Sequence, residues 1–85
     1  MRRWSFMKVV LVDDEQLALD ILERMIRKVG GIDIVGAFQD PLQALDFIKE
    51  AAVDVVFLDI SLPEINGLEI AEKLLEHQSH IHIVF

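Results

Sequence analysis

The 85-residue chain contains no cysteine, only two prolines and four glycines, and only eight basic side chains. Without cysteine it can form no disulfide, no thiolate metal site and no thiol nucleophile, which suits the reducing cytoplasm, where we expect the protein. Fifteen Asp and Glu residues leave a net charge of −7, so direct nucleic-acid binding by this segment is not expected. No apolar run approaches the roughly 18 residues that a membrane-spanning helix needs.

The amino terminus has one feature of a secretory signal, the basic start Met1-Arg2-Arg3. However, Lys8 interrupts the apolar run that follows and Asp13-Asp14-Glu15 ends it, so we reject a signal peptide. A chain of this length makes at most one small domain. We interpret residues 1–7 as an N-terminal extension and residues 8–85 as the domain core.

Apolar strand patterns alternate with amphipathic stretches along the chain. Lys8–Val12 and Val55–Leu58 are short and largely apolar on both faces, which is typical of buried strands in a parallel sheet. Two further strands are predicted at Ile32–Gly36 and Ile81–Phe85. The connections each contain a helix, so the order β-α-β-α-β-α-β predicts an α/β fold with parallel strands and right-handed crossovers.

Three helices are predicted between these strands. The first ends at Gly30-Gly31, the second begins with Asp40 as N-cap and Pro41 in its first turn, and the third follows Asn66. The residues expected on the inner faces are Leu17, Ile21, Met25 and Val29 with Ala18, Leu22 and Ile26 beside them, then Leu42, Leu45 and Ile48, then Leu68, Ala71, Leu74 and Leu75.

Two of the predicted strands end in carboxylates. Asp13-Asp14 follows the first strand, and Asp59 follows the third. If these strands are neighbours, about 4.8 Å apart, the acids crowd together, and each like-charged pair at about 4 Å costs about 1 kcal/mol in water. A hard cation such as Mg²⁺ would offset that repulsion. Either feature alone is common at turns and helix starts, but together on matching strand ends they indicate a site.

With this pattern the chain resembles the receiver domain of bacterial two-component response regulators. The match rests on Asp13-Asp14, on Asp59, and on the spacing from Asp59 through Pro63 to Gly67, and it covers the chain from Lys8 to Phe85. The resemblance implies a flavodoxin-like sheet in the order 2-1-3-4-5, which makes the first and third strands neighbours.

The resemblance also implies a role for each acid. Asp59 would be the phosphoacceptor, receiving a phosphoryl group from a sensor histidine kinase or from a small donor such as acetyl phosphate. Asp13, Asp14, Asp59 and the main-chain carbonyl of Ser61 would hold Mg²⁺. Such a domain catalyses only its own phosphorylation, so we expect a signalling module rather than an enzyme.

The sequence departs from the family pattern at its end. Receivers carry a Ser or Thr just after the fourth strand and a Lys after the fifth, but this sequence stops at Phe85. We therefore expect a truncated receiver that lacks the fifth strand and the last two helices. An uncovered fourth strand would favour a homo-oligomer. The residues around Asp59 weakly resemble regulators whose output domain binds DNA, but no output domain lies in this segment.

Three other interpretations remain open. The chain could be a receiver-like interaction module that takes no phosphate. It could be a metal-dependent phosphohydrolase, although such enzymes usually have a second Asp where this chain has Ser61. His80 and His82 share a strand face, with His77 nearby, and could suit Zn²⁺ or Ni²⁺, but no third ligand of fixed geometry is evident.

Overall fold

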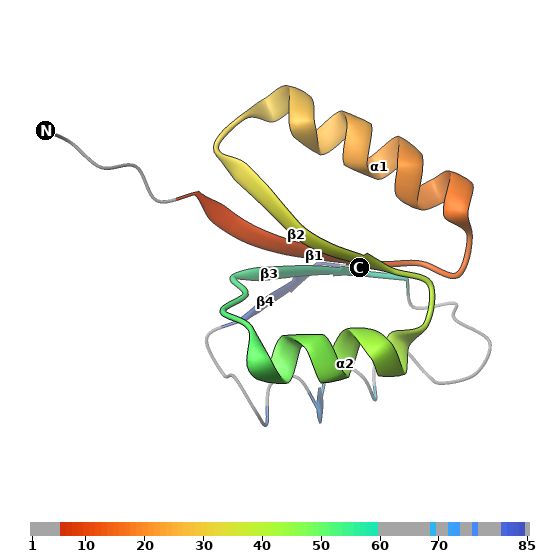
Figure 1. Cartoon of the computed structure of the whole chain (residues 1–85), viewed down its shortest axis with the longest axis vertical. Helices are drawn as coiled ribbons and strands as arrows, with labels where there is room; N and C mark the ends of the chain where they lie inside the picture. Colours follow the sequence, from red (N-terminus) through yellow and green to blue (C-terminus); the bar gives the residue numbers. More distant parts are fainter. Residues whose placement is uncertain (1–5, 60–68, 70–71, 74–75, 77–80, 85) are drawn as a thin grey trace, which may run out of the picture.

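The computed structural model describes residues 6–59, 69, 72–73, 76 and 81–84 (Figure 1). The elements that it delimits follow the predicted alternation of strands and helices. In chain order they are β1 (Met7–Val12), α1 (Gln16–Val29), β2 (Ile32–Phe38), α2 (Pro41–Glu50), β3 (Val55–Leu58) and β4 (His82–Val84). Among the described residues no helix has the length and apolar character needed to cross a membrane.

The third predicted helix can be followed only in part. Its described residues Glu69, Glu72, Lys73 and Glu76 are helical and exposed. The residues predicted for its inner face, and the loop from Ser61 through Pro63 to Gly67, lie outside the described residues.

The four strands form one parallel sheet in the order β2-β1-β3-β4. β1 therefore lies between β2 and β3, as the resemblance implied. β1 and β3 pair from Val9 opposite Val55 to Val12 opposite Leu58, so both strands end at the same edge of the sheet. This register brings the residues that follow Val12 and Leu58 together.

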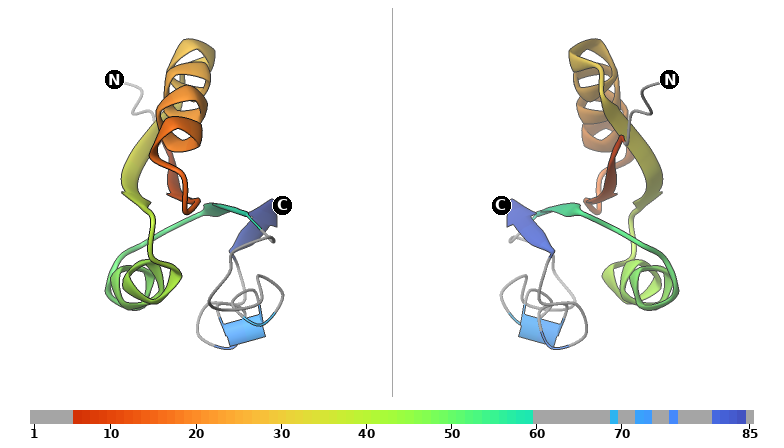
Figure 2. Two further views of the ribbon diagram at one scale, coloured as in Figure 1. Left: turned by 90° about the vertical axis from the view of Figure 1, so that its right-hand side faces the viewer. Right: turned by 90° about the vertical axis from the view of Figure 1, so that its left-hand side faces the viewer.

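Helices α1 and α2 pack on opposite faces of the sheet (Figures 1 and 2). Successive strand residues point to opposite faces, so β1 contributes Val9 and Leu11 to the α1 side and Val10 and Val12 to the α2 side. All four are at most 3% exposed. The prediction of a strand buried on both faces is confirmed for these residues, and the fold is a flavodoxin-like α/β fold.

The strand boundaries differ slightly from the predicted ones. β1 begins at Met7, one residue early, and β4 is described from His82 to Val84. β2 continues to Phe38 instead of ending at Gly36, because its pairing with β1 shifts register between Val9 and Val10 and then resumes. Gly36 therefore marks an irregularity within β2 and not the end of that strand.

The predicted inner face of α1 is wrong for its main row but confirmed for Ile26, which is buried, and for Leu22, which packs half-buried against the same core cluster. Leu17, Ile21, Met25 and Val29 are 69%, 48%, 60% and 73% exposed, and the residues that α1 buries are Leu19 and Ile26. Each four-residue step turns a helix by about 400°, so a row of residues spaced by four drifts by about 40° per step away from any one face. Residues 19 and 26, seven apart, return to nearly the same direction and reach the sheet.

The second helix behaves as predicted at its start. The Asp40 carboxylate accepts a hydrogen bond from the Leu42 backbone N–H at 2.9 Å, and Pro41 occupies the first turn. Leu45 and Ile48 are buried as expected, but Leu42 is 52% exposed, so its predicted place in the core is wrong. Ala44 is buried in its stead.

Candidate metal centre

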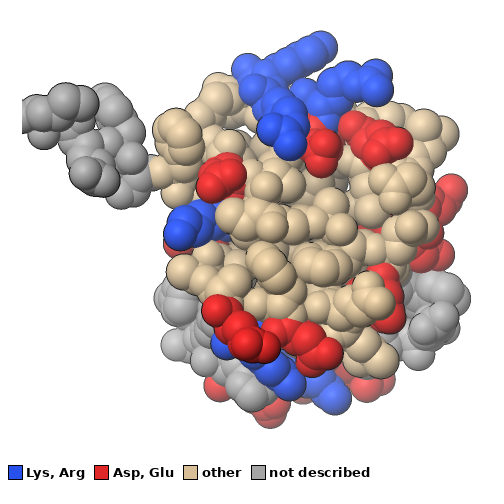
Figure 3. Space-filling view, viewed as in Figure 1, with Lys and Arg blue, Asp and Glu red and all other residues tan. Residues whose placement is uncertain are grey.

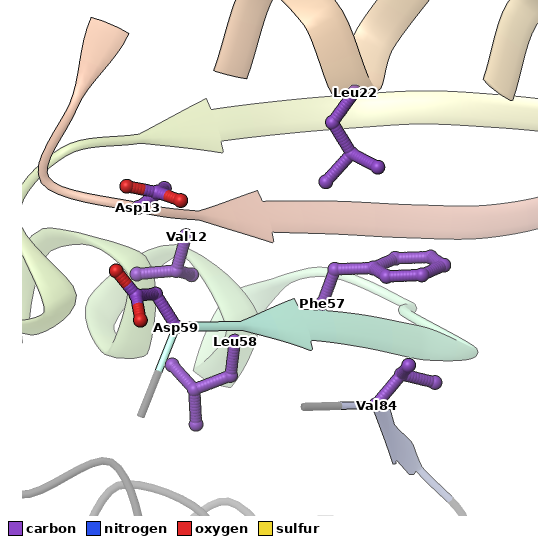
Figure 4. A pocket seen from close by; sticks show the side chains of 7 residues that line it. All are labelled: Val12, Asp13, Leu22, Phe57, Leu58, Asp59 and Val84. Carbon is purple, nitrogen blue, oxygen red and sulfur yellow. The ribbon is translucent and has the colours of Figure 1, made fainter. Parts of the chain in front are cut away.

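Asp13, Asp14 and Asp59 meet at the carboxyl edge of the sheet. One carboxylate oxygen from each lies within 4.8 Å of the others, although the residues are up to 46 positions apart in the chain. Figure 4 shows Asp13 and Asp59 side by side at the ends of β1 and β3. The structure therefore brings together three of the four predicted metal ligands. The fourth, Ser61, lies outside the described residues.

The backbone fixes where two of these acids begin. The Asp59 N–H donates to the Val12 carbonyl at 3.1 Å, so the end of β3 is held against β1. The Asp13 N–H donates to the Phe38 carbonyl at 3.0 Å, so the end of β1 is held against β2. Asp13 and Asp59 are half-buried and Asp14 is exposed. The strand ends therefore set the spacing of the carboxylates.

The short loop between β1 and α1 has its own hydrogen bonds. Asp13 Oδ1 accepts from the Glu15 backbone N–H at 3.0 Å, which closes a tight turn around the carboxylate. Gln39 Nε2 donates to the Asp14 main-chain carbonyl at 3.0 Å. Gln39 could not be predicted as part of this site, because no sequence motif marks it. Only the folded pairing of β2 with β1 brings it to this loop.

A pocket of about 330 Å³ adjoins the acids on the α1 side of the sheet. Its walls combine Asp13 and Asp59 with apolar side chains, including Phe57 of β3 and Leu22 of α1 (Figure 4). Asp59 therefore lies next to Asp13 in the lining of this pocket.

The donor set suits a hard divalent cation. Three carboxylates this close repel one another by about 1 kcal/mol per pair in water and by about 4 kcal/mol where the effective dielectric constant is near 20. Ligands of an octahedral Mg²⁺, each about 2.1 Å from the ion, lie about 3 to 4 Å from one another. The carboxylate oxygens, all within 4.8 Å of one another, are therefore close enough to bind one such ion together.

The predicted histidine site is not described as a whole. His82 is exposed on β4, and His77 and His80 lie outside the described residues. Among the described residues, the group of three or more potential metal ligands is the one formed by Asp13, Asp14 and Asp59.

With this geometry in place, comparison with known proteins identifies the family. The family model described as "Response regulator receiver domain" matches residues 9–85. The chain belongs to that family. As such it is a receiver domain of the response regulators of two-component systems, and the resemblance inferred from Asp13, Asp14 and Asp59 is confirmed at the level of the family.

Two curated relatives match over 79 residues, or 93% of the chain. An uncharacterized response regulatory protein of Yersinia pestis is 44% identical, and the transcriptional regulatory protein YpdB of Escherichia coli strain K12 is 38% identical. The matched part is 33% and 32% of these relatives, so the receiver spans about a third of their length.

The solved structures agree on the fold. A CheY-like response regulator receiver domain from Methanospirillum hungatei superposes with a TM-score of 0.84 at 23% identity, covering 93% of this chain and 62% of that one. At this level of identity the likeness concerns the architecture alone. It places the sheet order β2-β1-β3-β4 within the receiver fold.

Proposed function

We propose that this receiver accepts a phosphoryl group on Asp59, in a Mg²⁺-dependent reaction, from the phosphohistidine of a sensor histidine kinase. The observation that carries the proposal is the meeting of the Asp13, Asp14 and Asp59 carboxylates within 4.8 Å at the carboxyl ends of two paired strands. Membership of the response regulator receiver family supports the proposal, because the resemblance to receivers implies phosphoryl transfer to Asp59.

In this proposal Asp13, Asp14 and Asp59 hold Mg²⁺, with the Ser61 main-chain carbonyl as a further ligand. When bound, Mg²⁺ neutralises the charge that gathers on the phosphoryl oxygens and the carboxylates. The chain itself contributes to the reaction by positioning Asp59. Asp59 is fixed at the end of β3 by its N–H bond to Val12, so its carboxylate meets the donor without a rearrangement of the strand.

The chemical step exchanges one bond for another at phosphorus. A carboxylate oxygen of Asp59 attacks, the new P–O bond forms, and the P–N bond of the phosphohistidine breaks with its electron pair returning to the imidazole ring. The products are an acyl phosphate on Asp59 and a free histidine. With acetyl phosphate as donor, the leaving group is acetate. Asp59 is the only group that is changed on the receiver, so we propose a signalling domain and not a turnover enzyme.

The partners follow from this reaction and from the relatives. We propose a sensor histidine kinase as phosphodonor and the cytoplasm as location. The relation to the transcriptional regulatory protein YpdB favours a DNA-binding output domain in a longer protein, with no direct contribution from this acidic segment. We also propose that the chain self-associates through the outer edge of β4.

The test compares wild type with Asp59→Asn in Mg²⁺ and acetyl phosphate. We expect wild type to gain the mass of one phosphoryl group, Asp59→Asn to gain none, and EDTA to prevent the gain. Asp33→Asn is a matched control, because Asp33 is an exposed acid on β2 with the same charge. It should be modified as wild type is.

Other outcomes would contradict the proposal. A folded wild-type protein that takes neither phosphoryl nor beryllofluoride would favour the interaction module without phosphorylation. Sustained release of phosphate from phosphate esters would favour the phosphohydrolase.

A further inference from the structure

Gln39 lies in the turn between β2 and α2, and its side chain contacts the loop between β1 and α1. We infer that Gln39 is a positioning residue of the Mg²⁺ site, which holds Asp14 in place through the Asp14 main-chain carbonyl. This inference rests on the proposed function, since it concerns the site's readiness for the metal. Four features of the structure lead to it.

The first feature is the hydrogen bond itself. Gln39 Nε2 donates to the Asp14 carbonyl oxygen at 3.0 Å, across 25 positions of sequence. Asp14 is exposed, while Asp13 and Asp59 are half-buried between their strands. Mutual repulsion would therefore move Asp14 outward most easily. The bond from Gln39 restrains the peptide unit that carries the Asp14 carboxylate and opposes that movement.

The second feature is the irregularity in β2. Val9 pairs with Ile34 but Val10 pairs with Gly36, so Val35 is an extra residue in β2. A bulge of this kind redirects the rest of its strand and reverses which face each later side chain meets. The shift places Phe38 opposite Val12. Gln39, the next residue, then stands beside the loop that follows Val12.

The third feature is that the residues on both sides of Gln39 are anchored. The Phe38 ring packs against Phe47 with a centroid distance of 5.3 Å, and the Phe38 carbonyl accepts from Asp13. On the other side, Asp40 caps α2. The backbone of Gln39 is therefore already ordered, so its side-chain hydrogen bond requires little further loss of backbone entropy.

The fourth feature concerns Gly36, which lets the Phe38 ring approach. A Cβ on Gly36 would lie 2.7 Å from Phe38 Cε2 and 3.5 Å from Phe47 Cε2, so a larger residue would displace the ring. Together, the bulge in β2, the Phe38–Phe47 ring pair and the N-cap of α2 position Gln39 beside the loop between β1 and α1. Outer groups that orient metal ligands in this way commonly tune metal affinity.

The experiment measures Mg²⁺ affinity of the complete chain by calorimetry, in wild type, Gln39→Met and Gln39→Ala. Met keeps the length and neutrality of Gln but cannot donate a hydrogen bond. Since one hydrogen bond contributes about 1 kcal/mol net, we expect the Mg²⁺ dissociation constant to rise about three- to tenfold in both variants. Gln43→Met is the matched control, because Gln43 is an exposed glutamine on α2, and it should bind as wild type does.

A second measurement separates positioning from general stabilisation. In the metal-free protein, amide hydrogen exchange at Glu15, whose N–H bonds to Asp13, should become faster in Gln39→Met, while exchange in the β1 and β3 core stays unchanged. Faster exchange throughout the sheet would instead show a purely structural role and overturn the inference.

The outcomes distinguish the two proposals. If wild type binds Mg²⁺ and Gln39→Met binds it equally well, or Gln43→Met loses as much affinity, the positioning role is wrong while the proposed function stands. If wild type binds no Mg²⁺, both are wrong.

Discussion

At the scale of single residues, the three carboxylates that meet at the sheet edge repel one another, and we expect this repulsion to lower the stability of the metal-free protein. Asp14 is the exposed member of the cluster. Asp14→Asn removes one of three negative charges, so we expect it to stabilise the metal-free protein by up to about 1 kcal/mol at low salt, and less as salt screens the charges. The same variant should bind Mg²⁺ more weakly. Urea unfolding with EDTA, at two salt concentrations, measures the first effect.

The control for this prediction is Asp33→Asn, which removes one exposed acid outside the cluster. It should change metal-free stability by less than Asp14→Asn does. A metal-free Asp14→Asn protein that is less stable than wild type would show that the Asp14 carboxylate makes a favourable contact that outweighs the repulsion.

The site residues differ in how far sequence could predict them. Asp13, Asp14 and Asp59 could be predicted, because each directly follows an apolar strand and parallel strands end at one edge of a sheet. Gln39 could not, because its position depends on the extra residue Val35 in β2. Local patterns report which residue follows a strand, whereas a bulge is decided by packing between strands.

At the scale of elements, helix α1 is held by fewer residues than its composition suggests. Leu19 and Ile26 are 2% and 6% exposed, whereas Leu17 and Met25 are 69% and 60% exposed. We expect Leu19→Ala and Ile26→Ala each to destabilise the fold by about 2 to 5 kcal/mol, because they leave cavities against the sheet. Leu17→Ala should cost less than about 1 kcal/mol.

Chemical denaturation of the four alanine variants, Met25→Ala included, measures this difference. Leu17→Ala and Met25→Ala serve as controls, because they make the same kind of truncation in the same helix. Equal losses at Leu17 and Leu19 would mean that the outer face of α1 is covered in solution.

The predicted inner face of α1 was partly wrong because apolar residues lie on most sides of this helix. Periodicity alone therefore does not determine which face is buried; packing against the sheet determines it.

At the scale of the whole molecule, the sheet order was predictable and the surface was not. Strand order followed from the resemblance, since the receiver fold requires β1 between β2 and β3. The surface depends on which side chains the sheet leaves uncovered. Several Lys and Arg side chains lie over α1 at the top of Figure 3 with acidic side chains beside them, and further Asp and Glu side chains lie on the right, where β1 runs into α1. The large apolar residues that α1 leaves exposed are Leu17, Ile21, Met25 and Val29.

Two exposed features are candidate surfaces for self-association: the outer edge of β4 and the exposed apolar residues of α1. A substitution on each surface distinguishes them. β4 pairs with β3 on one side, and among the described strands it is the outermost on its other side, with Val84 41% exposed. Because an outer strand offers unpaired backbone groups, we expect the chain to associate through β4 at micromolar concentration. Val84→Lys should then reduce the associated fraction in sedimentation experiments, since a charged side chain on an edge strand disfavours pairing.

The control is Met25→Lys, which places the same charge on the exposed face of α1 and should leave association unchanged. Loss of association in Met25→Lys alone would move the contact to α1, and a wild-type chain that stays monomeric would rule out both surfaces.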